Sequence, residues 1–328
     1  MAVLSSCISR NDNTAEIDSR PRLTVIAAIS GVGDNGYNDK VLDGIMKFYE
    51  SHDVAMSLVR PTTIDEARSM LQKWLSENED EQSLLVLAGS DYETLMKAEN
   101  ITTAKNWNIL LFESDNIPGI STFRIQRYGI SYLAGCMASP HKEAAVVAAL
   151  PEEQILEDGI LGFSEGYGAQ SGHRANVVYL ADDYYGYIMS DTAYRLASSL
   201  DEAFVYPLAG GSNNGLYKYS REHNFGTMLV AGMDVDCSAY SDRVPFSVVI
   251  RIDEVIEHYL DDWYQGKNLA GHQTFGLESG FVDIVISPSF YEETDIFEDY
   301  YQDDDYWRNA YNQYKAEALR KEAEYEAK

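Results

Sequence analysis

The sequence has few cysteines, few histidines and no long hydrophobic run. Its 328 residues include three cysteines, Cys7, Cys136 and Cys237. This odd number without metal-like spacing argues against a disulfide framework or a zinc site. The six histidines form neither an HExxH motif nor a histidine pair, so we expect no metal. No apolar run reaches the length of a membrane span. These features argue against a disulfide-stapled domain, a zinc protein and a membrane-spanning protein.

Basic residues are also scarce. The chain has 25 Lys and Arg against 53 Asp and Glu, which gives a formal net charge of −28. Such a charge repels nucleic-acid phosphates and anionic membrane surfaces. We therefore expect neither nucleic acid nor a membrane surface as a partner of the folded body. The length is sufficient for two domains of ordinary size.

The first 22 residues differ from the rest of the chain. Leu4-Ser5-Ser6-Cys7 has the form of a bacterial lipobox, in which small residues precede a cysteine that receives lipid. Residues 8–22 are polar and show no period, as a flexible tether would. Six residues are too few for the apolar region of a signal peptide, so this interpretation requires a natural chain that begins earlier. The lipobox predicts an exported protein anchored by acyl chains at Cys7. The alternative is a chance LSSC sequence.

From Leu23 onward, short apolar runs alternate with amphipathic helical patterns. Four buried strands are expected at residues 23–29, 54–59, 83–89 and 108–114, with helices between them. A second cycle begins at Lys142, with strands expected at residues 143–150, 176–182, 204–210 and 227–234. Repeated strand–helix units form doubly wound parallel sheets with right-handed crossovers. We therefore predict an α/β protein of two similar lobes, each a doubly wound parallel sheet flanked by helices.

The late segments are expected to cross back between the lobes. We assign residues 23–139 with about 246–271 to the first lobe, and residues 140–245 with about 272–289 to the second. Residues 290–328 form an acidic and aromatic C-terminal extension. Its Trp307, Tyr311, Tyr314 and Ala318 follow a helical spacing, which predicts a helix that docks on a lobe or, alternatively, binds a partner.

Polar, glycine-rich turns follow four of the predicted strands, two in each lobe. In open α/β sheets, ligands bind beside the carboxyl ends of the strands, so these turns define a cleft. Their carboxylates, carboxamides and aromatic ring suit a small, polar, flat ligand. The candidate ligand-binding residues in these turns are Asp34, Asn35, Tyr37, Asn38, Ser90, Asp91, Gly211, Ser212 and Asp234.

Two other interpretations of the first turn remain open. Gly31-x-Gly33-x-x-Gly36 matches the dinucleotide fingerprint, and Arg60 at the end of the second strand suits a 2′-phosphate. An NADP-dependent oxidoreductase is therefore a minor alternative. A plain helix cap at Asp34 or Asn35 is the simplest explanation, and it is compatible with a ligand site.

Seven motifs in the same order resemble the basic membrane protein (Bmp) family. This family comprises lipid-anchored substrate-binding components of ABC importers and includes the purine-nucleoside receptors. Residues 34–38, DNGYN, are similar to its D-x-S-F-N turn, and residues 127–135, RYGISYLAG, to its F-x-x-Y-L-A-G helix. The other motifs lie at residues 162–166, 209–215, 232–234, 247–253 and 275–287. The resemblance spans Leu23 to about Pro288 and does not include the tail.

The resemblance implies a type I periplasmic-binding-protein-like fold and a monomeric, exported receptor without enzymatic activity or cofactor. It implies an ABC permease as partner and a nucleoside-like ligand, on whose base Tyr37 stacks and whose ribose diol donates to Asp234. An orphan sensing module without transport is the alternative.

Some positions depart from the family pattern. The family lysine falls at Ile250, with Arg251 beside it as the candidate cation, and Ala28 or Ser30 replaces a first-turn aspartate. The candidates for a second stacking aromatic ring are Tyr184, Tyr185 and Tyr217.

Overall fold

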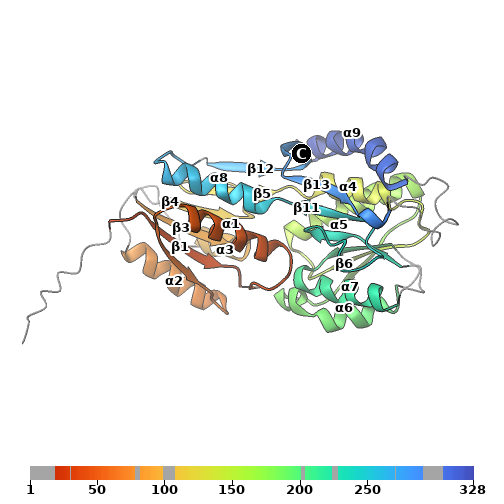
Figure 1. Cartoon of the computed structure of the whole chain (residues 1–328), viewed down its shortest axis with the longest axis horizontal. Coiled ribbons are helices and arrows are strands. Elements are labelled where there is room, and N and C mark those ends of the chain that lie inside the picture. Colours follow the sequence, from red (N-terminus) through yellow and green to blue (C-terminus); the bar gives the residue numbers. More distant parts are fainter. Residues whose placement is uncertain are drawn as a thin grey trace, which may run out of the picture.

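The computed structural model describes residues 19–29, 31–77, 82–98, 108–200, 204–223, 228–269, 271–290 and 306–328. The predicted lipidation site Cys7 and the first-turn position Ser30 lie outside the described residues. The chain forms two α/β lobes side by side, with helices on both faces of each (Figure 1). All strand pairs are parallel in the first lobe, and one pair in the second lobe, residues 246–250 with 282–286, is antiparallel. None of the helices in the described ranges is both long and apolar enough to cross a bilayer.

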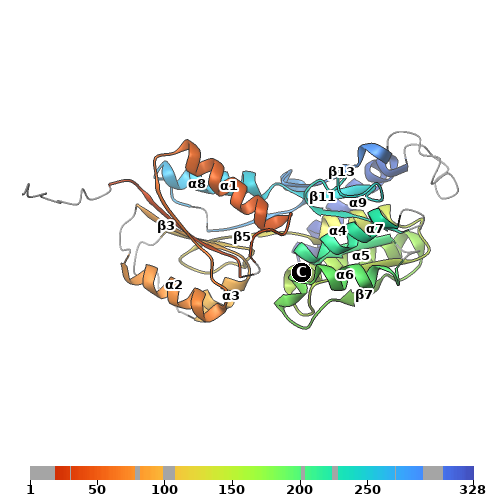
Figure 2. The same cartoon turned by 60° about the horizontal axis from the view of Figure 1, so that its bottom comes forward.

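The first lobe contains a six-stranded parallel sheet in the order β12-β5-β4-β3-β1-β2. Its strands are β1 (Arg22–Ala27), β2 (Ala55–Val59), β3 (Ser83–Ala88), β4 (Asn108–Phe112), β5 (Ser121–Ile125) and β12 (His272–Phe275). Helices α1 (Tyr37–Ser51) and α8 (Ile252–Tyr264) cover one face, and α2 (Ile64–Glu77) and α3 (Asp91–Ala98) the other (Figure 2). Alternate residues of β3 serve the two faces: Leu84 packs towards α1 and α8, and Leu85 towards α2 and α3. Burial on both faces explains the continuous apolar runs.

The second lobe has four parallel strands in the order β7-β6-β8-β9, continued by the three-stranded sheet β10-β11-β13. The strands are β6 (Ala144–Ala148), β7 (Asn176–Tyr179), β8 (Phe204–Leu208), β9 (Leu229–Val230), β10 (Gly232–Asp234), β11 (Phe246–Ile250) and β13 (Val282–Ile286). Helices α4 (Tyr128–Met137), α5 (Gln154–Ser171) and α9 (Tyr306–Glu326) pack on one side, and α6 (Ser190–Ala197) and α7 (Asn213–Glu222) on the other. Short 3-10 turns complete the lobe: η1 (Tyr184–Ile188), η2 (Gly210–Ser212), η3 (Leu277–Ser279) and η4 (Pro288–Phe290).

In the described part of the chain, the backbone crosses between the lobes three times, at residues 126–127, 251 and 276. These crossings correct the predicted lobe boundaries. Helix α4 packs against α5, so it belongs to the second lobe. Strand β11 pairs with β10 and β13, also in the second lobe, whereas β12 pairs with β5 in the first. The prediction was wrong for these segments because the sequence pattern of a short apolar run does not indicate which sheet it joins.

The C-terminal extension is helical where it is described, and α9 docks on the second lobe as the docking alternative predicts. The Trp307 side chain is only 3% exposed and lies among the rings of Phe204 and Phe246. The acidic residues 291–305 lie outside the described part of the chain.

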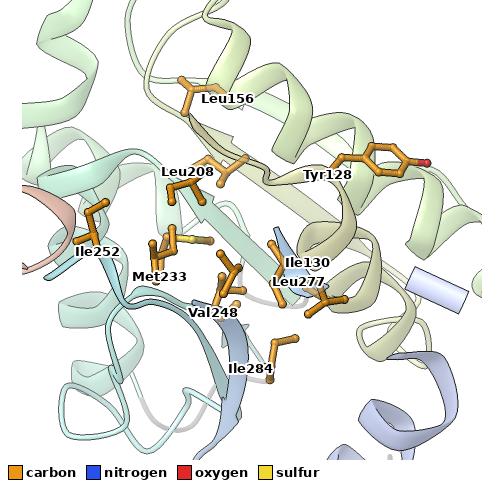
Figure 3. Close-up of a cluster of buried hydrophobic side chains, with 14 of the residues drawn as sticks. Tyr128, Ile130, Leu156, Leu208, Met233, Val248, Ile252, Leu277 and Ile284 are labelled. Carbon is orange, nitrogen blue, oxygen red and sulfur yellow. The ribbon is translucent and has the colours of Figure 1, made fainter. Parts of the chain in front are cut away.

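The hydrophobic core reaches the junction of the lobes. In Figure 3, Leu156 of α5, Leu208 of β8 and Met233 of β10 belong to one buried cluster with Val248 and Leu277. The first three also line a cavity between the lobes. The walls of this cavity are therefore continuous with the core and are held rigidly by it.

Candidate functional site

A cavity of about 360 Å³ lies between the lobes, at the carboxyl ends of strands from both sheets. Because β1 and β3 are neighbours in the first sheet, the loops that follow them lie side by side and form one wall. The opposite wall comes from η1, η2 and the end of β10. The volume is within the range of small-molecule sites. The sequence-predicted residues that line it are Asp34, Tyr37, Asn38, Ser90, Asp91, Tyr184, Gly211 and Asp234.

Polar contacts join the lobes around this cavity. The Asn214 Nδ2 atom in the second lobe donates to the Asp34 carbonyl oxygen in the first, at 3.2 Å. The Tyr37 backbone N–H donates to the Asp234 carboxylate, and the Ser90 hydroxyl donates to the Glu153 carboxylate. The structure is therefore a closed arrangement of the two lobes.

The first turn both caps a helix and forms part of the cavity wall. The Asp34 carboxylate accepts hydrogen bonds from the Gly36 and Asn38 backbone N–H groups at 2.9 and 3.0 Å, so it satisfies the amino end of α1. Asn35, with φ of 55°, is exposed and does not line the cavity. Nine residues, 28–36, separate β1 from α1. This long connection holds polar side chains at the cavity and differs from a tight glycine turn around a pyrophosphate.

A buried ion pair that the sequence analysis missed forms part of the cavity wall. The Arg127 guanidinium donates to both Glu113 oxygens, from Nη2 at 2.8 Å and from Nη1 at 3.0 Å. The Arg127 Cζ atom also lies 5.8 Å from the centre of the Tyr37 ring. A bidentate pair of this kind has a fixed geometry, and the cation–ring contact orients Tyr37. Glu113 directly follows β4, and this position at the end of a strand could have identified it as a candidate site residue.

The Asp234 carboxyl group has a strongly perturbed acidity. Burial raises the pKa of Asp234 to about 7, against the lowering effect of the Arg127 charge. The nearby Asp34 and Glu113 carboxylates raise this pKa further, and the Tyr37 N–H lowers it. The backbone at Asp234 is left-handed, with φ of 69°. A ligand that donates hydrogen bonds to Asp234 would favour its ionised form.

The raised pKa predicts a pH-dependent contribution of Asp234 to stability. A group with a folded-state pKa of about 7, above its ordinary value of 3.8, stabilises the fold fully below about pH 3.8 and loses this effect as the pH rises through 7. The wild-type protein should therefore lose stability relative to Asp234→Asn between about pH 4 and pH 7, by about 1.4 kcal/mol per unit of pKa difference. Urea unfolding of both proteins across this range is the measurement. A difference that is constant with pH would contradict the prediction.

A second group of polar side chains lies at the η1 end of the cavity. The Asp91 carboxylate accepts a hydrogen bond from the Ile29 N–H at 3.0 Å, and burial raises the pKa of Asp91. Burial also raises the pKa of Glu153, which accepts from the Tyr184 hydroxyl at 3.4 Å. The Tyr184 ring stacks on Tyr187, another cavity residue that the sequence analysis missed, with ring centres 6.3 Å apart.

Besides Asn35, four predicted ligand-binding residues lie away from the cavity. Ser212 is fully buried in the second lobe. Its hydroxyl donates a hydrogen bond to the Gly186 carbonyl oxygen and accepts one from the Met189 N–H. Tyr217 is in the second-lobe core, where its hydroxyl accepts from the Met233 N–H at 3.1 Å. These two side chains, predicted as ligand contacts, instead hold the backbone that forms the cavity wall.

Tyr185 and Arg251 are also displaced from the predicted ligand position. Tyr185 is 67% exposed and points outside the cavity. Arg251 is at a crossing between the lobes, where its guanidinium donates to the Gly280 carbonyl oxygen. The candidate cation beside Ile250 therefore does not reach this cavity. Arg127 is the one cationic side chain that lines it within the described part of the chain.

Arg60, the residue expected to hold a 2′-phosphate, also lies away from the cavity. Arg60 follows β2, the edge strand of the first sheet, and is exposed outside the cavity lining. Among the residues that the structure describes, no group of three or more His, Cys, Asp or Glu side chains is placed to hold a metal ion.

A known protein family matches the chain over most of its length. The model of the family described as "ABC transporter substrate-binding protein PnrA-like", or Bmp, matches residues 23–313. The chain belongs to the Bmp family. It is accordingly a substrate-binding protein of the ABC-transporter type. The match extends into α9, so the expectation that the family pattern ends near Pro288 was wrong. No curated protein matches the chain.

Solved structures share the fold of this Bmp-family chain. A solute-binding protein of an ABC transporter system from Aeropyrum pernix K1 superposes with a TM-score of 0.69 and 17% identity, over 92% of this chain and 89% of that one. One from Conexibacter woesei has a TM-score of 0.57 and 12% identity, over 91% and 95%. A sugar-binding protein from Bacillus halodurans has a TM-score of 0.55 and 15% identity, over 86% and 100%. At these identities the likeness concerns the fold alone, which is that of periplasmic binding proteins.

Proposed function

We propose that this protein is an extracytoplasmic receptor that closes its two lobes on a nucleoside-like ligand, with purine nucleosides favoured, and delivers it to an ABC permease. The observation that supports this most directly is the cavity between the lobes, with an aromatic ring, Tyr37, on one wall and a carboxyl group, Asp234, on the other. A flat base stacks on such a ring, and a ribose diol donates to such a carboxylate. Closure by hinge bending is the usual binding step of two-lobed receptors.

The charges in the cavity favour an uncharged or cationic ligand. Among the described residues, four carboxyl groups line it, those of Asp34, Asp91, Glu113 and Asp234, against the single guanidinium of Arg127. Because Glu113 already neutralises this guanidinium, a phosphate group would find carboxylates and no free cation. The ligand is therefore a nucleoside in preference to a nucleotide.

A thermal-shift screen followed by calorimetry tests the proposed ligand class. The panel contains adenosine, guanosine, inosine, their 5′-monophosphates, the free bases and ribose. A ligand that binds only the folded protein raises the unfolding temperature by mass action. We expect a shift with purine nucleosides and none with the monophosphates. A shift with another class and none with nucleosides would contradict the proposal.

Replacing Tyr37 by alanine is expected to weaken nucleoside binding by about tenfold, because a ring stack contributes roughly 0.5–1.5 kcal/mol beyond its burial. The Tyr37 hydroxyl lies next to the Glu113 carboxylate. Tyr37→Phe keeps the ring and removes only this hydroxyl, so it should retain nearly wild-type affinity and serves as the matched control. Calorimetry with adenosine or guanosine compares the three proteins. Equal binding by the alanine variant would remove Tyr37 from the site.

We further propose that the protein is anchored by lipid at Cys7 to the membrane that contains its ABC importer. The lipobox pattern and the family of the chain support this proposal. Intact-mass spectrometry of the protein isolated from its native membrane would show acyl chains on the residue at this position. An unmodified Cys7 would contradict the anchor and would leave the ligand proposal unchanged.

A further inference from the structure

The last turns of α9 lie against the crossings between the lobes. This helix runs along the second lobe (Figure 1), and its amino end is fixed there by Trp307 and by the Tyr306 hydroxyl, which donates to the Met137 carbonyl oxygen at 2.8 Å. Its carboxyl end contacts Tyr128 and Gly129, which directly follow the first crossing, and Gly276 and Leu277 at the third. The helix therefore contacts two of the three segments that must bend when the lobes move.

Glu322 is wedged between these two crossings. Its side chain is 5% exposed, and its Oε1 accepts a hydrogen bond from the Leu277 N–H at 2.9 Å. Gly129 and Gly276 leave the space that this carboxyl group occupies, since a β-carbon on either glycine would overlap the Glu322 oxygens. The absence of side chains at Gly129 and Gly276 thus makes room for one side chain of α9.

Tyr325 links the same helix to the first lobe indirectly, through a residue of α5. Its ring lies parallel to the Tyr128 ring, with centres 4.3 Å apart and an interplanar angle of 4°. Its hydroxyl donates to Asp158 Oδ1 of α5 at 2.7 Å. The other Asp158 oxygen accepts from the guanidinium of Arg124, which belongs to β5 of the first lobe. A continuous polar chain therefore runs from α9 through the second lobe to the first.

The opposite side of the first crossing faces the ligand cavity. Arg127, immediately before the Tyr128 that stacks on Tyr325, lines the cavity and pairs there with Glu113. The end of α9 and the ligand site are consequently separated by the thickness of one backbone segment. A displacement of residues 126–129 would move Arg127 and the Tyr37 ring that it contacts.

We propose that Glu322 and Tyr325 are positioning residues for ligand binding, which hold the first and third crossings in the closed arrangement of the lobes. Neither touches the cavity, so their loss shifts the equilibrium towards the open form and weakens binding without removing a ligand contact. The inference rests on the proposed function, because it takes lobe closure as the binding step.

The test measures opening directly and without ligand. Fluorophores are placed on Ser69→Cys in the first lobe and Ser198→Cys in the second, in a Cys7→Ser background. Both serines are exposed, whereas Cys136 and Cys237 are buried. Energy transfer between the fluorophores then reports the fractions of open and closed protein. The variants are Tyr325→Phe, which removes only the hydroxyl, and Glu322→Gln.

Tyr311→Phe is the matched control on the same helix. The Tyr311 hydroxyl donates to Asp283 of β13 at 2.7 Å, a contact within the second lobe. Tyr325→Phe should raise the ratio of open to closed protein about three- to tenfold, as expected for the loss of one buried hydrogen bond. Glu322→Gln keeps an oxygen that can accept from the Leu277 N–H, so it should raise this ratio less than Tyr325→Phe does. Tyr311→Phe should lower the unfolding temperature without changing this ratio. If Tyr325→Phe leaves the ratio unchanged, or changes it no more than Tyr311→Phe does, the proposal is overturned.

A binding measurement separates this proposal from the ligand assignment. With adenosine or guanosine, the dissociation constant of Tyr325→Phe should rise by the factor by which the closed fraction falls. If neither nucleoside binds the wild-type protein, the ligand assignment fails while the energy-transfer result still decides the role of α9. Since Tyr325→Phe is a conservative change, a failure of Glu322→Gln to fold would leave this test intact.

Discussion

Asp234→Asn is expected to weaken binding of a purine nucleoside by about 100-fold or more. A buried carboxylate that accepts two hydroxyl groups of a ribose makes charge-assisted hydrogen bonds, each contributing roughly 1.5–3 kcal/mol. Asparagine keeps the size of the side chain and an oxygen for the Tyr37 N–H, so the helix contact seen in the closed structure is retained. Calorimetry should be done above pH 8, because the pKa of about 7 leaves the wild-type group ionised there.

Asp182→Asn is the control for the change in net charge. Asp182 is an exposed residue of the second lobe that does not line the cavity. The control should bind like the wild-type protein. If Asp234→Asn also binds like the wild type, the sugar of the ligand does not contact Asp234 and the proposed orientation of the nucleoside is wrong.

Gly166→Ala is expected to lower the free energy of unfolding by about 3 kcal/mol or more. Helices α4 and α5 pack backbone to backbone: a β-carbon at Gly166 would overlap the Tyr132 carbonyl oxygen, and one at Gly135 would overlap the Phe163 carbonyl oxygen. Neither oxygen is on a flexible side chain, so the helices would have to separate. Urea unfolding followed by circular dichroism is the measurement.

Gly168→Ala, two residues further along α5, is the matched control. A β-carbon at this position meets only the His173 carbonyl oxygen, at 3.3 Å. Because alanine has a higher helix propensity than glycine by about 1 kcal/mol, the control should be nearly neutral or slightly stabilising. Equal destabilisation by both substitutions would show that close packing is not the reason for Gly166.

The sequence predicted the cavity residues correctly where polar side chains follow the end of a buried strand. The polar turns after β1 and β3 follow unmistakable buried strands, and parallel pairing brings their ends together, so Asp34, Tyr37, Ser90 and Asp91 line one cavity. Ser212 lies in the same kind of turn in the second lobe, and Tyr217 lies in the helix that follows it, yet both side chains face the core. Periodicity places a residue on a turn or a helix. It does not say whether the side chain points to solvent, ligand or core.

The sequence by itself determined the alternation of strands and helices, the two-lobed α/β class and the order of motifs that defines the family, because these depend on local burial patterns and residue types. Only the tertiary structure decided which lobe receives β11, β12 and α4, that Glu113 pairs with Arg127, and that burial raises the pKa of Asp234. Each of these depends on contacts between residues far apart in the chain. A strand of suitable pattern fits either sheet, and an ionisable group acquires its acidity from the neighbours that folding brings to it.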